Sequence, residues 1–493
     1  MRTAYSVETV RNAERELMAR LPEGALMQRA AAGLAAACAD LLGGGSGAGR
    51  VSAVGRVYGS KVVVLAGSGA NGGDALYAGA RLAARGARVW AVPLAADRTH
   101  EGGLAALLGA GGRVADDPFE VLAVADLVLD GITGIGGRGG LRPDAVPVAR
   151  AARGGRGVIV AVDLPSGVEA DSGEVAGEAL RADATVTFGA YKPGLLIDPA
   201  REYAGALRLV DIGLGPYLPS VPELEALQHE DVARLLPAPT GESDKYRRGV
   251  VGIVAGSARY PGAAVLAVAG ALRGGAGAVR YVGPGGDAVI AHYPETLVHE
   301  GPPSKAGRVQ AWAVGPGLGD GPGVADALAS DVPVLVDADG LRLLDPATVR
   351  ARTAPTLLTP HAGEAAALLG VDRAEVESGR LAAVRELAAR YGATVLLKGS
   401  TTLVASPDQG VPVRVNPTGT PWLATAGSGD VLSGLAGSLL ASGLDPRDAA
   451  SAAAYLHGLA GRLASHGAPV TAHEVAEAVR GAWRDVVGVR AGA

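Results

Sequence analysis

The chain has 493 residues, more than one typical domain holds, so we expect two or three domains that each bury a core of their own. A net charge of -5 gives no basic surface of the kind that binds nucleic acid, and we expect no such partner. The single cysteine, Cys38, excludes an intramolecular disulfide framework and fits a reducing cytoplasm.

The sequence gives no sign of membrane insertion. Residues 1–16 carry scattered charges instead of the apolar core of a signal peptide. Every long apolar stretch is broken by Gly, Arg or Asp before 18 residues, so we expect no transmembrane helix and a cytoplasmic protein. Regular patterns persist through the 75 glycines, which indicates a folded chain and not a low-complexity one.

The first half of the chain alternates between helical and strand-like segments. Apolar residues at helical spacing predict helical structure within residues 6–41, and a helix is predicted over 75–85. Strands are predicted at residues 61–65, 88–94, 126–132, 158–162 and 184–188. This alternation predicts an α/β domain with a Rossmann-like, doubly wound parallel sheet.

Polar side chains follow these predicted strands: Asn71, Asp74, Asp130, Asp163, Ser166 and Lys192. Because the carboxyl ends of parallel strands share one edge of a sheet, these side chains are candidates to line one pocket. Asn71, Asp130 and Ser166 offer hard oxygen donors, which suit an alkali or alkaline-earth cation beside a bound phosphate. Each is alternatively a turn residue bonded to its own loop, but their recurrence at successive strand ends favours the pocket.

Two proline-rich segments follow, at residues 215–222 and 237–244, with a short predicted helix at 229–236 between them. We therefore expect a first domain at 1–215, a linker with a lead-in helix at 216–240, and a second domain at 241–493.

The centre of the second half is the turn Thr425-Ala-Gly-Ser-Gly429, which leads into an apolar helical pattern with Asp430 at the junction. A helix entered through such a turn offers free N–H groups and its positive dipole end to an anion. Asp430 is placed to accept the proton of a hydroxyl that attacks a phosphoryl group. The alternative is a simple helix cap.

Three more polar loops follow strand-like runs in this half: Asp337-Ala-Asp339, Thr359-Pro-His-Ala-Gly-Glu364 and Lys398-Gly-Ser-Thr-Thr402. They supply a cation, hydroxyls and carboxylates, and we expect them to share one rim with Asp430.

The order of these motifs resembles the bifunctional NAD(P)H-hydrate repair enzymes over nearly the full chain. In that family an NAD(P)H-hydrate epimerase is fused to an ADP-dependent (S)-NAD(P)H-hydrate dehydratase of ribokinase-like α/β fold. The first half carries Gly69-Ala-Asn-Gly-Gly-Asp74, Asp130-Gly-Ile-Thr-Gly-Ile-Gly-Gly-Arg-Gly139, Asp163-Leu-Pro-Ser-Gly167 and Tyr191-Lys-Pro-Gly194. The second half carries Gly262-Ala263, Gly315-Pro-Gly-Leu-Gly319, Thr359-Pro-His-Ala-Gly-Glu364, Lys398-Gly399, Asn416-Pro-Thr-Gly419 and Gly427-Ser-Gly-Asp-Val-Leu432.

For the epimerase half, the resemblance implies that potassium binds Asn71, Asp130 and Ser166. It implies contacts with the hydrated nucleotide from Ala70, Asn71, Gly72, Gly73, Asp74, Gly134, Ile135, Gly136, Gly137, Arg138, Gly139, Gly140 and Asp163. Asp163 and Lys192 are the candidates for proton handling at the hydrated carbon. One departure is Ala70, where the family usually has asparagine, so this position is expected to contact substrate through its backbone only.

For the dehydratase half, the resemblance implies substrate contacts from Ala263, Gly317 or Gly319, His361 and Asp430. It implies that Lys398, Gly399, Ser400, Thr401, Thr402 and Gly429 hold the adenine nucleotide. ADP would phosphorylate the substrate hydroxyl with Asp430 as base, and elimination of phosphate would restore the dihydronicotinamide. Magnesium is expected on the ADP phosphates, with Glu364 taking part through water.

The expected partners are therefore small molecules, namely NADH-hydrate, NADPH-hydrate and ADP, with no membrane partner. A homo-oligomer is expected because such assemblies are common among soluble enzymes. The alternatives are a small-molecule kinase of the ribokinase group, which would release a phosphorylated product, and a first domain that serves only as a binding or scaffold module.

Overall fold

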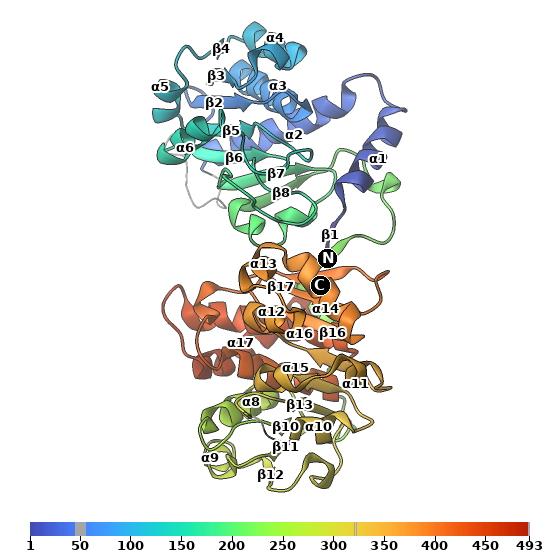
Figure 1. Cartoon of the computed structure of the whole chain (residues 1–493). Coiled ribbons are helices and arrows are strands. Elements are labelled where there is room, and N and C mark those ends of the chain that lie inside the picture. Colours follow the sequence, from blue (N-terminus) through green and yellow to red (C-terminus); the bar gives the residue numbers. More distant parts are fainter. Residues whose placement is uncertain (45–55, 320, 322, 492–493) are drawn as a thin grey trace. The chain divides into compact units, whose positions relative to one another are not determined.

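The chain folds into two compact units in a computed structural model that describes residues 1–44, 56–319, 321 and 323–491 (Figure 1). The N-terminal unit is Thr3–Glu223, and the C-terminal unit is Leu224–Ala493 together with Met1–Arg2. The domain boundaries predicted from the sequence, at residues 215 and 241, stay a prediction.

The N-terminal unit contains a seven-stranded sheet in the order β4-β3-β2-β5-β6-β7-β8, and every neighbouring pair is parallel. Its strands are β2 (Lys61–Ala66), β3 (Arg88–Pro93), β4 (Arg113–Val114), β5 (Leu127–Gly131), β6 (Val158–Val162), β7 (Ala184–Phe188) and β8 (Ala206–Val210). The chain moves outward from β2 in one direction and resumes on its other side at β5. This reversal confirms the predicted doubly wound sheet and places a ligand crevice at the carboxyl ends of β2 and β5.

Helices pack on this sheet, and the buried apolar residues of the sheet and the helices form two separate clusters. The helices are α1 (Val7–Met18), α2 (Ala25–Leu42), α3 (Ala70–Ala84), α4 (Glu101–Gly109), α5 (Pro118–Ala123) and α6 (Val146–Gly154). Helices α1, α2 and α3 contribute to one cluster, and α5 and α6 to the other. The predicted helical region 6–41 is two helices, and the predicted helix 75–85 begins earlier, at Ala70, because the turn 70–74 forms its first turn.

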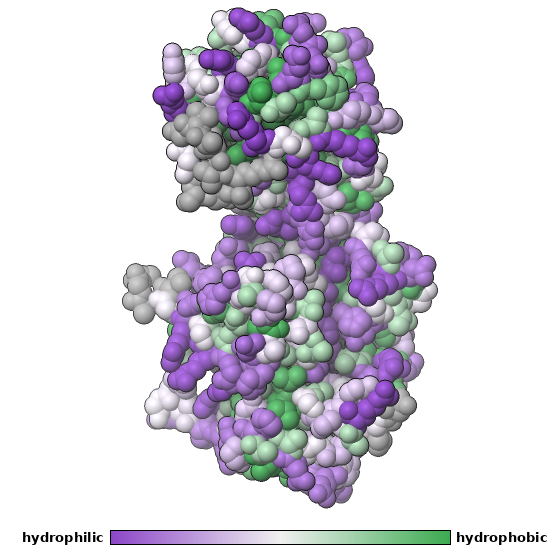
Figure 2. Space-filling view, turned by 90° about the vertical axis from the view of Figure 1, so that its left-hand side faces the viewer, coloured by the Kyte–Doolittle hydropathy of each residue, from purple (hydrophilic) through white to green (hydrophobic). Residues whose placement is uncertain are grey.

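By length and composition alone, the 18 residues of helix α2 are apolar enough to cross a membrane. It instead supplies eight buried residues, among them Leu34 and Cys38, to the N-terminal unit, where it packs on α3. Burial raises the pKa of the Cys38 thiol to about 12, so this cysteine is a small apolar core residue. On the face shown in Figure 2, hydrophobic residues occur in small groups between hydrophilic ones.

The C-terminal unit contains an eleven-stranded sheet in the order β1-β9-β18-β17-β16-β15-β14-β13-β10-β11-β12. The strands are β1 (Arg2–Ala4), β9 (Leu224–Ala226), β10 (Val250–Val254), β11 (Ala278–Val282), β12 (Leu297–His299), β13 (Ala311–Val314), β14 (Val334–Val336), β15 (Thr356–Leu358), β16 (Thr394–Leu397), β17 (Thr402–Ala405) and β18 (Val413–Asn416). From β16 to β12 all pairs are parallel, whereas β17 is antiparallel to both neighbours. The order reverses between β10 and β13, which gives a second crevice at their carboxyl ends.

The helices of the C-terminal unit are α7 (His229–Leu235), α8 (Pro261–Arg273), α9 (Gly286–His292), α10 (Gly323–Leu328), α11 (Pro346–Arg350), α12 (Ala362–Leu369), α13 (Arg373–Ser378), α14 (Arg380–Tyr391), α15 (Ser428–Ala441), α16 (Pro446–Ser465) and α17 (Ala472–Ala491). Short 3-10 helices lie at Ala96–Arg98, Pro193–Leu195, Ala200–Tyr203, Gly215–Tyr217, Pro303–Lys305, Ala338–Leu343 and Pro421–Leu423 across the two units.

Helices α8 and α15 approach each other through glycine. A Cβ atom at Gly434 would lie 1.9 Å from the carbonyl oxygen of Ala267, and one at Gly270 would lie 2.1 Å from that of Val431. Only glycine permits this backbone-to-backbone packing. The contact fixes the first turn of α15, which carries Asp430, against α8.

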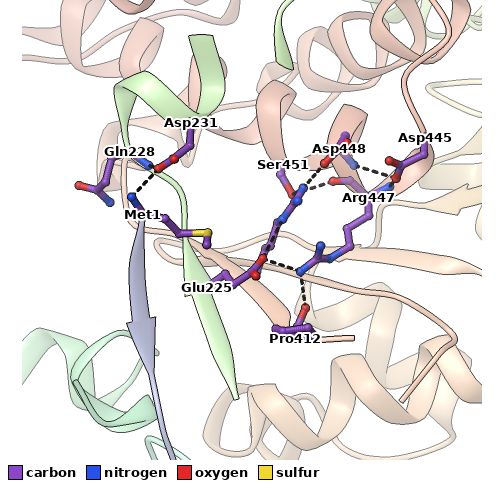
Figure 3. Close-up of polar contacts among 10 residues, drawn as sticks. Met1, Glu225, Gln228, Asp231, Pro412, Asp445, Arg447, Asp448 and Ser451 are labelled. Carbon is purple, nitrogen blue, oxygen red and sulfur yellow. Dashed lines mark hydrogen bonds and ion pairs between the residues drawn. The ribbon is translucent and has the colours of Figure 1, made fainter. Parts of the chain in front are cut away.

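The segment 216–240, predicted as a linker with a helix, contains that helix, α7, and also the unpredicted strand β9. Strand β9 pairs in parallel with β18. The Glu225 side chain of β9 lies between two arginines from elsewhere in the C-terminal unit. Its carboxylate accepts a hydrogen bond from Arg447 at 2.8 Å (Figure 3) and one from Arg414 at 3.4 Å. Arg414 also pairs with Asp448. Charge pairing therefore fastens the segment to the sheet.

We expect Glu225→Gln to lower the free energy of unfolding of the C-terminal unit by about 2–4 kcal/mol, because two poorly exposed guanidinium groups lose their shared carboxylate. Urea unfolding of the full chain measures the effect. Glu230→Gln is the matched control, since its 3.3 Å pair with Arg234 is exposed and is worth about 0.5 kcal/mol or less. Equal effects from the two variants would contradict the assignment.

Candidate active sites

In the N-terminal unit, Asp130 and Ser166 meet at the carboxyl edge of the sheet, and both are fully buried. The Ser166 hydroxyl donates to Asp130 at 2.6 Å, and the Ser166 amide donates to the same carboxylate at 2.8 Å. Asn71 joins through Thr133, whose carbonyl accepts from the Asn71 amide at 3.0 Å. Burial raises the pKa of Asp130 to about 6 although the Ser166 bonds oppose the shift. A cation bound beside it would relieve this desolvation.

A second pair, Asp163 and Lys192, lies at the ends of β6 and β7. The Lys192 ammonium is 1% exposed and bonds to the Asp163 carboxylate. The same carboxylate oxygen accepts from the Thr187 hydroxyl at 2.9 Å and from the Phe188 amide at 3.2 Å. Asp163 has a φ of 66°, a left-handed conformation that a non-glycine residue rarely adopts. Strain of this kind clusters at functional sites, and here it aims the carboxylate at Lys192.

Two further carboxylates surround this pair. One oxygen of Asp74 is buried without a hydrogen-bond partner in the described part of the chain. Burial, followed by the charges of Asp163 and Glu14, raises the pKa of Asp74 well above its usual range. Burial also raises the pKa of Glu14 on α1, where Lys192 opposes the shift and Asp163 adds to it. The site therefore combines one lysine with three carboxylates, which favours keeping a proton in the cluster at neutral pH.

The predicted glycine loop 134–140 borders the group formed by Asn71, Asp130 and Ser166, since a Cβ at Gly134 would lie 3.1 Å from the Asn71 side chain. A cavity of about 350 Å³ lies beside the loop, lined by Arg138, Gly139, Gly140, Gly167, Glu169, Ser172, Glu174 and Ala176. Residues Ala70, Gly72 and Gly73 lie in the first turn of α3, together with Asn71 and Asp74. A Cβ at Gly72 would lie 2.3 Å from the carbonyl oxygen of Gly67, so glycine is required there.

In the C-terminal unit, a lysine whose side chain is 18% exposed also pairs with a buried aspartate at strand ends. Lys398 follows β16 and bonds to Asp337, which follows β14, at 2.7 Å, and it lies 3.7 Å from Glu364. The other oxygen of Asp337 accepts from Ser433 of α15 at 2.5 Å. Burial disfavours the charged amine, but Asp337 and Glu364 outweigh it and keep the pKa of Lys398 above its usual value. A fixed positive charge thus lies at the rim.

Asp430 lies beside this charge, in the first turn of α15. The helix begins after Gly427, whose φ of 87° makes the sharp entry turn, and a Cβ at Gly429 would lie 3.5 Å from the Lys398 ammonium. Burial raises the pKa of Asp430 to about 7, with Asp337 adding to the shift and Lys398 opposing it. The arrangement combines a base poised near neutral pH with helix N–H groups and a lysine, which suits phosphoryl transfer.

The other predicted substrate residues adjoin this site through glycine turns. A Cβ at Gly317 would lie 2.7 Å from the Cβ of Ala263, so these two positions are in contact. The Gly319 amide donates to Asp339 at 2.9 Å. His361 begins α12, where its ring accepts from the Glu364 amide and the Glu364 carboxylate accepts from the His361 amide. This capping box holds Glu364 beside Lys398.

The predicted nucleotide loop 398–402 is organised by Arg380, which the sequence did not single out. The Arg380 guanidinium is buried and donates to the carbonyl groups of Leu397, Lys398 and Thr401 at 3.3, 3.0 and 3.1 Å. Gly399 and Ser400 are exposed, whereas Thr401 and Thr402 are 3% and 8% exposed. In this arrangement the backbone of the loop and the exposed residues are the groups available to a ligand.

Comparisons with known proteins identify the family of the chain. Residues 251–480 match the family model described as NAD(P)H-hydrate dehydratase, and residues 23–194 match that of the YjeF-related protein N-terminus. The chain is 49% identical over 457 residues to the bifunctional NAD(P)H-hydrate repair enzyme Nnr of Mycobacterium tuberculosis, covering 92% of each protein. It is 46% identical to that of Mycobacterium leprae over 94% of each. The chain belongs to the bifunctional NAD(P)H-hydrate repair enzyme family.

This membership confirms the family, the enzyme class and the two α/β folds predicted from the sequence. Among solved structures, the chain is similar to an ADP/ATP-dependent NAD(P)H-hydrate dehydratase from Bacillus subtilis that was co-crystallized with ATP and Mg²⁺. The identity is 31%, over 52% of this chain and 97% of that chain, with a TM-score of 0.48.

Sequence reasoning placed the strand-end residues but missed Glu14, Arg380 and the pairing of Asp337 with Lys398. Glu14 lies within α1 and not at a strand end, and Arg380 begins α14. Glu14 is one of several charged residues on an amphipathic helix, and nothing in the sequence pattern sets it apart. Its position near Lys192 and Asp163 is set by tertiary packing.

Asp430 also predicts a pH dependence of stability. Its folded pKa of about 7 lies above its ordinary value of 3.8, so its stabilising contribution is complete below about pH 4 and is lost as pH rises through about 7. We expect Asp430→Asn to stabilise the C-terminal unit by about 2–4 kcal/mol at about pH 8, with a gain that shrinks toward about pH 5. Urea unfolding at several pH values measures it.

Asp244→Asn is the control for this prediction. Backbone N–H groups of Arg247 and Tyr246 hold the pKa of the exposed Asp244 below its usual range, so its removal is expected to weaken stability slightly at the same high pH. A gain from Asp430→Asn that does not change with pH would show that its carboxyl is not desolvated.

Proposed function

We propose that this chain repairs hydrated NADH and NADPH, with epimerisation in the N-terminal unit and ADP-dependent dehydration of the S form in the C-terminal unit. The observation that carries the proposal is the Asp430 site, where a carboxylate of pKa about 7 lies beside a helix N-terminus and Lys398. Family membership over 92% of the chain supports both activities.

In the dehydratase step, the oxygen of the substrate hydroxyl attacks the terminal phosphorus of ADP while Asp430 accepts the proton of that hydroxyl. AMP is the leaving group. The N–H groups of Gly429 and Asp430 and the Lys398 ammonium stabilise the charge on the transferred phosphoryl group. The carbon–oxygen bond then breaks, phosphate leaves, and loss of a proton from the neighbouring carbon restores the dihydronicotinamide. Phosphorylation is needed because hydroxide is a poor leaving group.

The nucleotide in this proposal lies along Lys398, Gly399, Ser400, Thr401, Thr402 and Gly429, and the substrate contacts Ala263, Gly317 or Gly319, and His361. Exposure of Gly399 and Ser400 supports the first set, and the contact of Gly317 with Ala263 supports the second. Magnesium would be carried by the ADP phosphates with Glu364 as a partner through water, where it offsets phosphate charge. The described residues hold no cluster of three or more His, Cys, Asp or Glu side chains that would bind the ion alone.

In the epimerase step, Asp163 and Lys192 handle protons at the hydrated ring carbon, while residues 70–74 and 134–140 hold the nucleotide. Potassium fits Asn71, Asp130 and Ser166, because the buried Asp130 has a raised pKa and only hydrogen-bond donors for partners. The ion would supply positive charge beside the bound phosphates. Both epimers would then reach the stereospecific dehydratase.

The remaining parts of the proposal concern the cell and the assembly. We infer a cytoplasmic homo-oligomer from the single buried thiol and from the frequency of symmetric enzymes. Light scattering on the purified full chain would contradict the oligomer if it gave the mass of one chain.

The dehydratase assignment is tested with (S)-NADH-hydrate, ADP and magnesium, by the return of dihydronicotinamide absorbance. We expect Asp430→Asn to lower kcat by about 10²- to 10⁴-fold because the hydroxyl loses its base. In the natural chain kcat should rise through about pH 7 as Asp430 loses its proton. Asp244→Asn is the control and should retain full activity; release of a stable phosphorylated product would instead identify a kinase.

The epimerase assignment is tested with a mixture of both epimers, in which restoration should show a fast phase and a slower phase limited by epimerisation. Asp163→Asn is expected to slow the second phase by about 10²-fold or more and to spare the first, because Lys192 loses its partner. The exposed Asp144 provides the control Asp144→Asn. Replacing potassium by choline should slow the same phase. If neither Asp163→Asn nor the removal of potassium changes the rate of the second phase, the assignment is refuted.

A further inference from the structure

Helix α1 lies outside the region matched by the family model, which begins at residue 23, yet it adjoins the epimerase site. The Val7 amide, at its first turn, donates to Asp171 at 2.7 Å, and the Tyr5 amide donates to the Tyr191 carbonyl at 3.0 Å. Tyr191 directly precedes Lys192. The helix is therefore held at both the loop 167–176 and the strand end that carries the catalytic lysine.

One face of α1 turns toward the site. Val10, Ala13 and Leu17 are buried and join the core of the N-terminal unit, against which Ile135 of the glycine loop also packs. Glu14 experiences the charges of Lys192 and Asp163. Arg11, one turn earlier, lies over the loop 134–140: a Cβ at Gly136 would be 2.9 Å from a terminal nitrogen of its guanidinium.

Arg11 places an exposed positive charge at this position. Among the residues that the structure describes, it makes no hydrogen bond and no ion pair, and its charge acts on Glu14 only at longer range. The nearby cavity is lined by Glu169 and Glu174 as well as by Arg138, so the acidic side chains need cations beside them before a doubly charged anion can bind. A guanidinium next to glycine backbone N–H groups is suited to a pyrophosphate, which it can bind with two parallel bonds.

We propose that Arg11 of helix α1 binds the pyrophosphate of the dinucleotide substrate in the epimerase site. Helix α1 thereby forms one wall of that site, with the guanidinium of Arg11 close to Gly136. The proposal rests on the proposed epimerase function and deepens it: substrate recognition extends to a helix that precedes the matched family region.

The test is the second kinetic phase of the full chain on mixed epimers. Arg11→Ala is expected to raise KM of that phase at least about tenfold with kcat changed less than about threefold, since the charge-assisted contact with the pyrophosphate is lost from binding and not from chemistry. Arg11→Lys should restore part of the loss. The first phase serves as an internal measure that the chain is folded and its C-terminal unit active.

Arg15→Ala is the matched control, because Arg15 lies on the same helix, is exposed and bonds to Asn12 instead of facing the loop. An unchanged KM in Arg11→Ala, or an equal rise in Arg15→Ala, would overturn the proposal. If the natural chain shows no epimerisation at all, the proposed function fails, and calorimetry with ADP-ribose then decides on Arg11. Weaker binding in Arg11→Ala than in Arg15→Ala would support the pyrophosphate contact, and equal binding would overturn it.

Discussion

A lysine paired with an aspartate from another strand end fixes the carboxyl edge of the sheet in each unit. In the N-terminal unit the pair is Asp163 with Lys192, and in the C-terminal unit it is Asp337 with Lys398. Breaking a buried pair of this kind leaves an uncompensated charge, which costs about 3–5 kcal/mol, so the loops that carry the two partners are fixed to each other. The other groups of each site are placed around that fixed charge.

The parallel sheets bring these paired residues to one edge, and close packing of the helices fixes where the other site residues lie. Strands that run the same way deliver their polar loops to one edge, and the reversal of strand order opens a crevice there. In the C-terminal unit, α8 and α15 pack closely through Gly270 and Gly434. This packing sets the position of the α15 N-terminus, so that Asp430 and the free N–H groups of the helix lie beside Lys398. Some of the glycines thus occupy positions where any side chain would strike backbone.

Site residues at strand ends are easier to predict from the sequence than those that reach the site from other elements. Asn71, Asp130, Ser166 and Lys192 were predicted because each comes after an apolar run, and the fold brings the first three together. Periodicity also located β6 and β7 with their observed bounds. The turns 70–74 and 428–429 were expected as loops, but they are first turns of helices, because glycine tolerates helical geometry where the N–H groups are free to face a ligand.

Contacts made across long separations are not visible in sequence patterns. Glu14 reaches Lys192 from a helix near the start of the chain, and Arg380 reaches the carbonyl groups around Lys398 from the start of another. Neither residue interrupts a pattern, since a charged residue on an amphipathic helix normally faces solvent. Strand β9 was missed because three residues are too few for an alternation to appear, and its place is fixed by Glu225 between two arginines.

Both sites crowd carboxylates around one lysine, and this crowding links their chemistry to their stability. Asp74 and Asp430 have raised pKa values because desolvation and neighbouring carboxylates penalise the charged form. The same penalty lowers the stability of the folded chain as these groups lose their protons. An isolated aspartate in water is a weak base at neutral pH. Asp430 instead gains and loses its proton near pH 7, because its carboxyl is buried. The unfavourable burial of this carboxyl therefore makes it a better base toward the substrate hydroxyl.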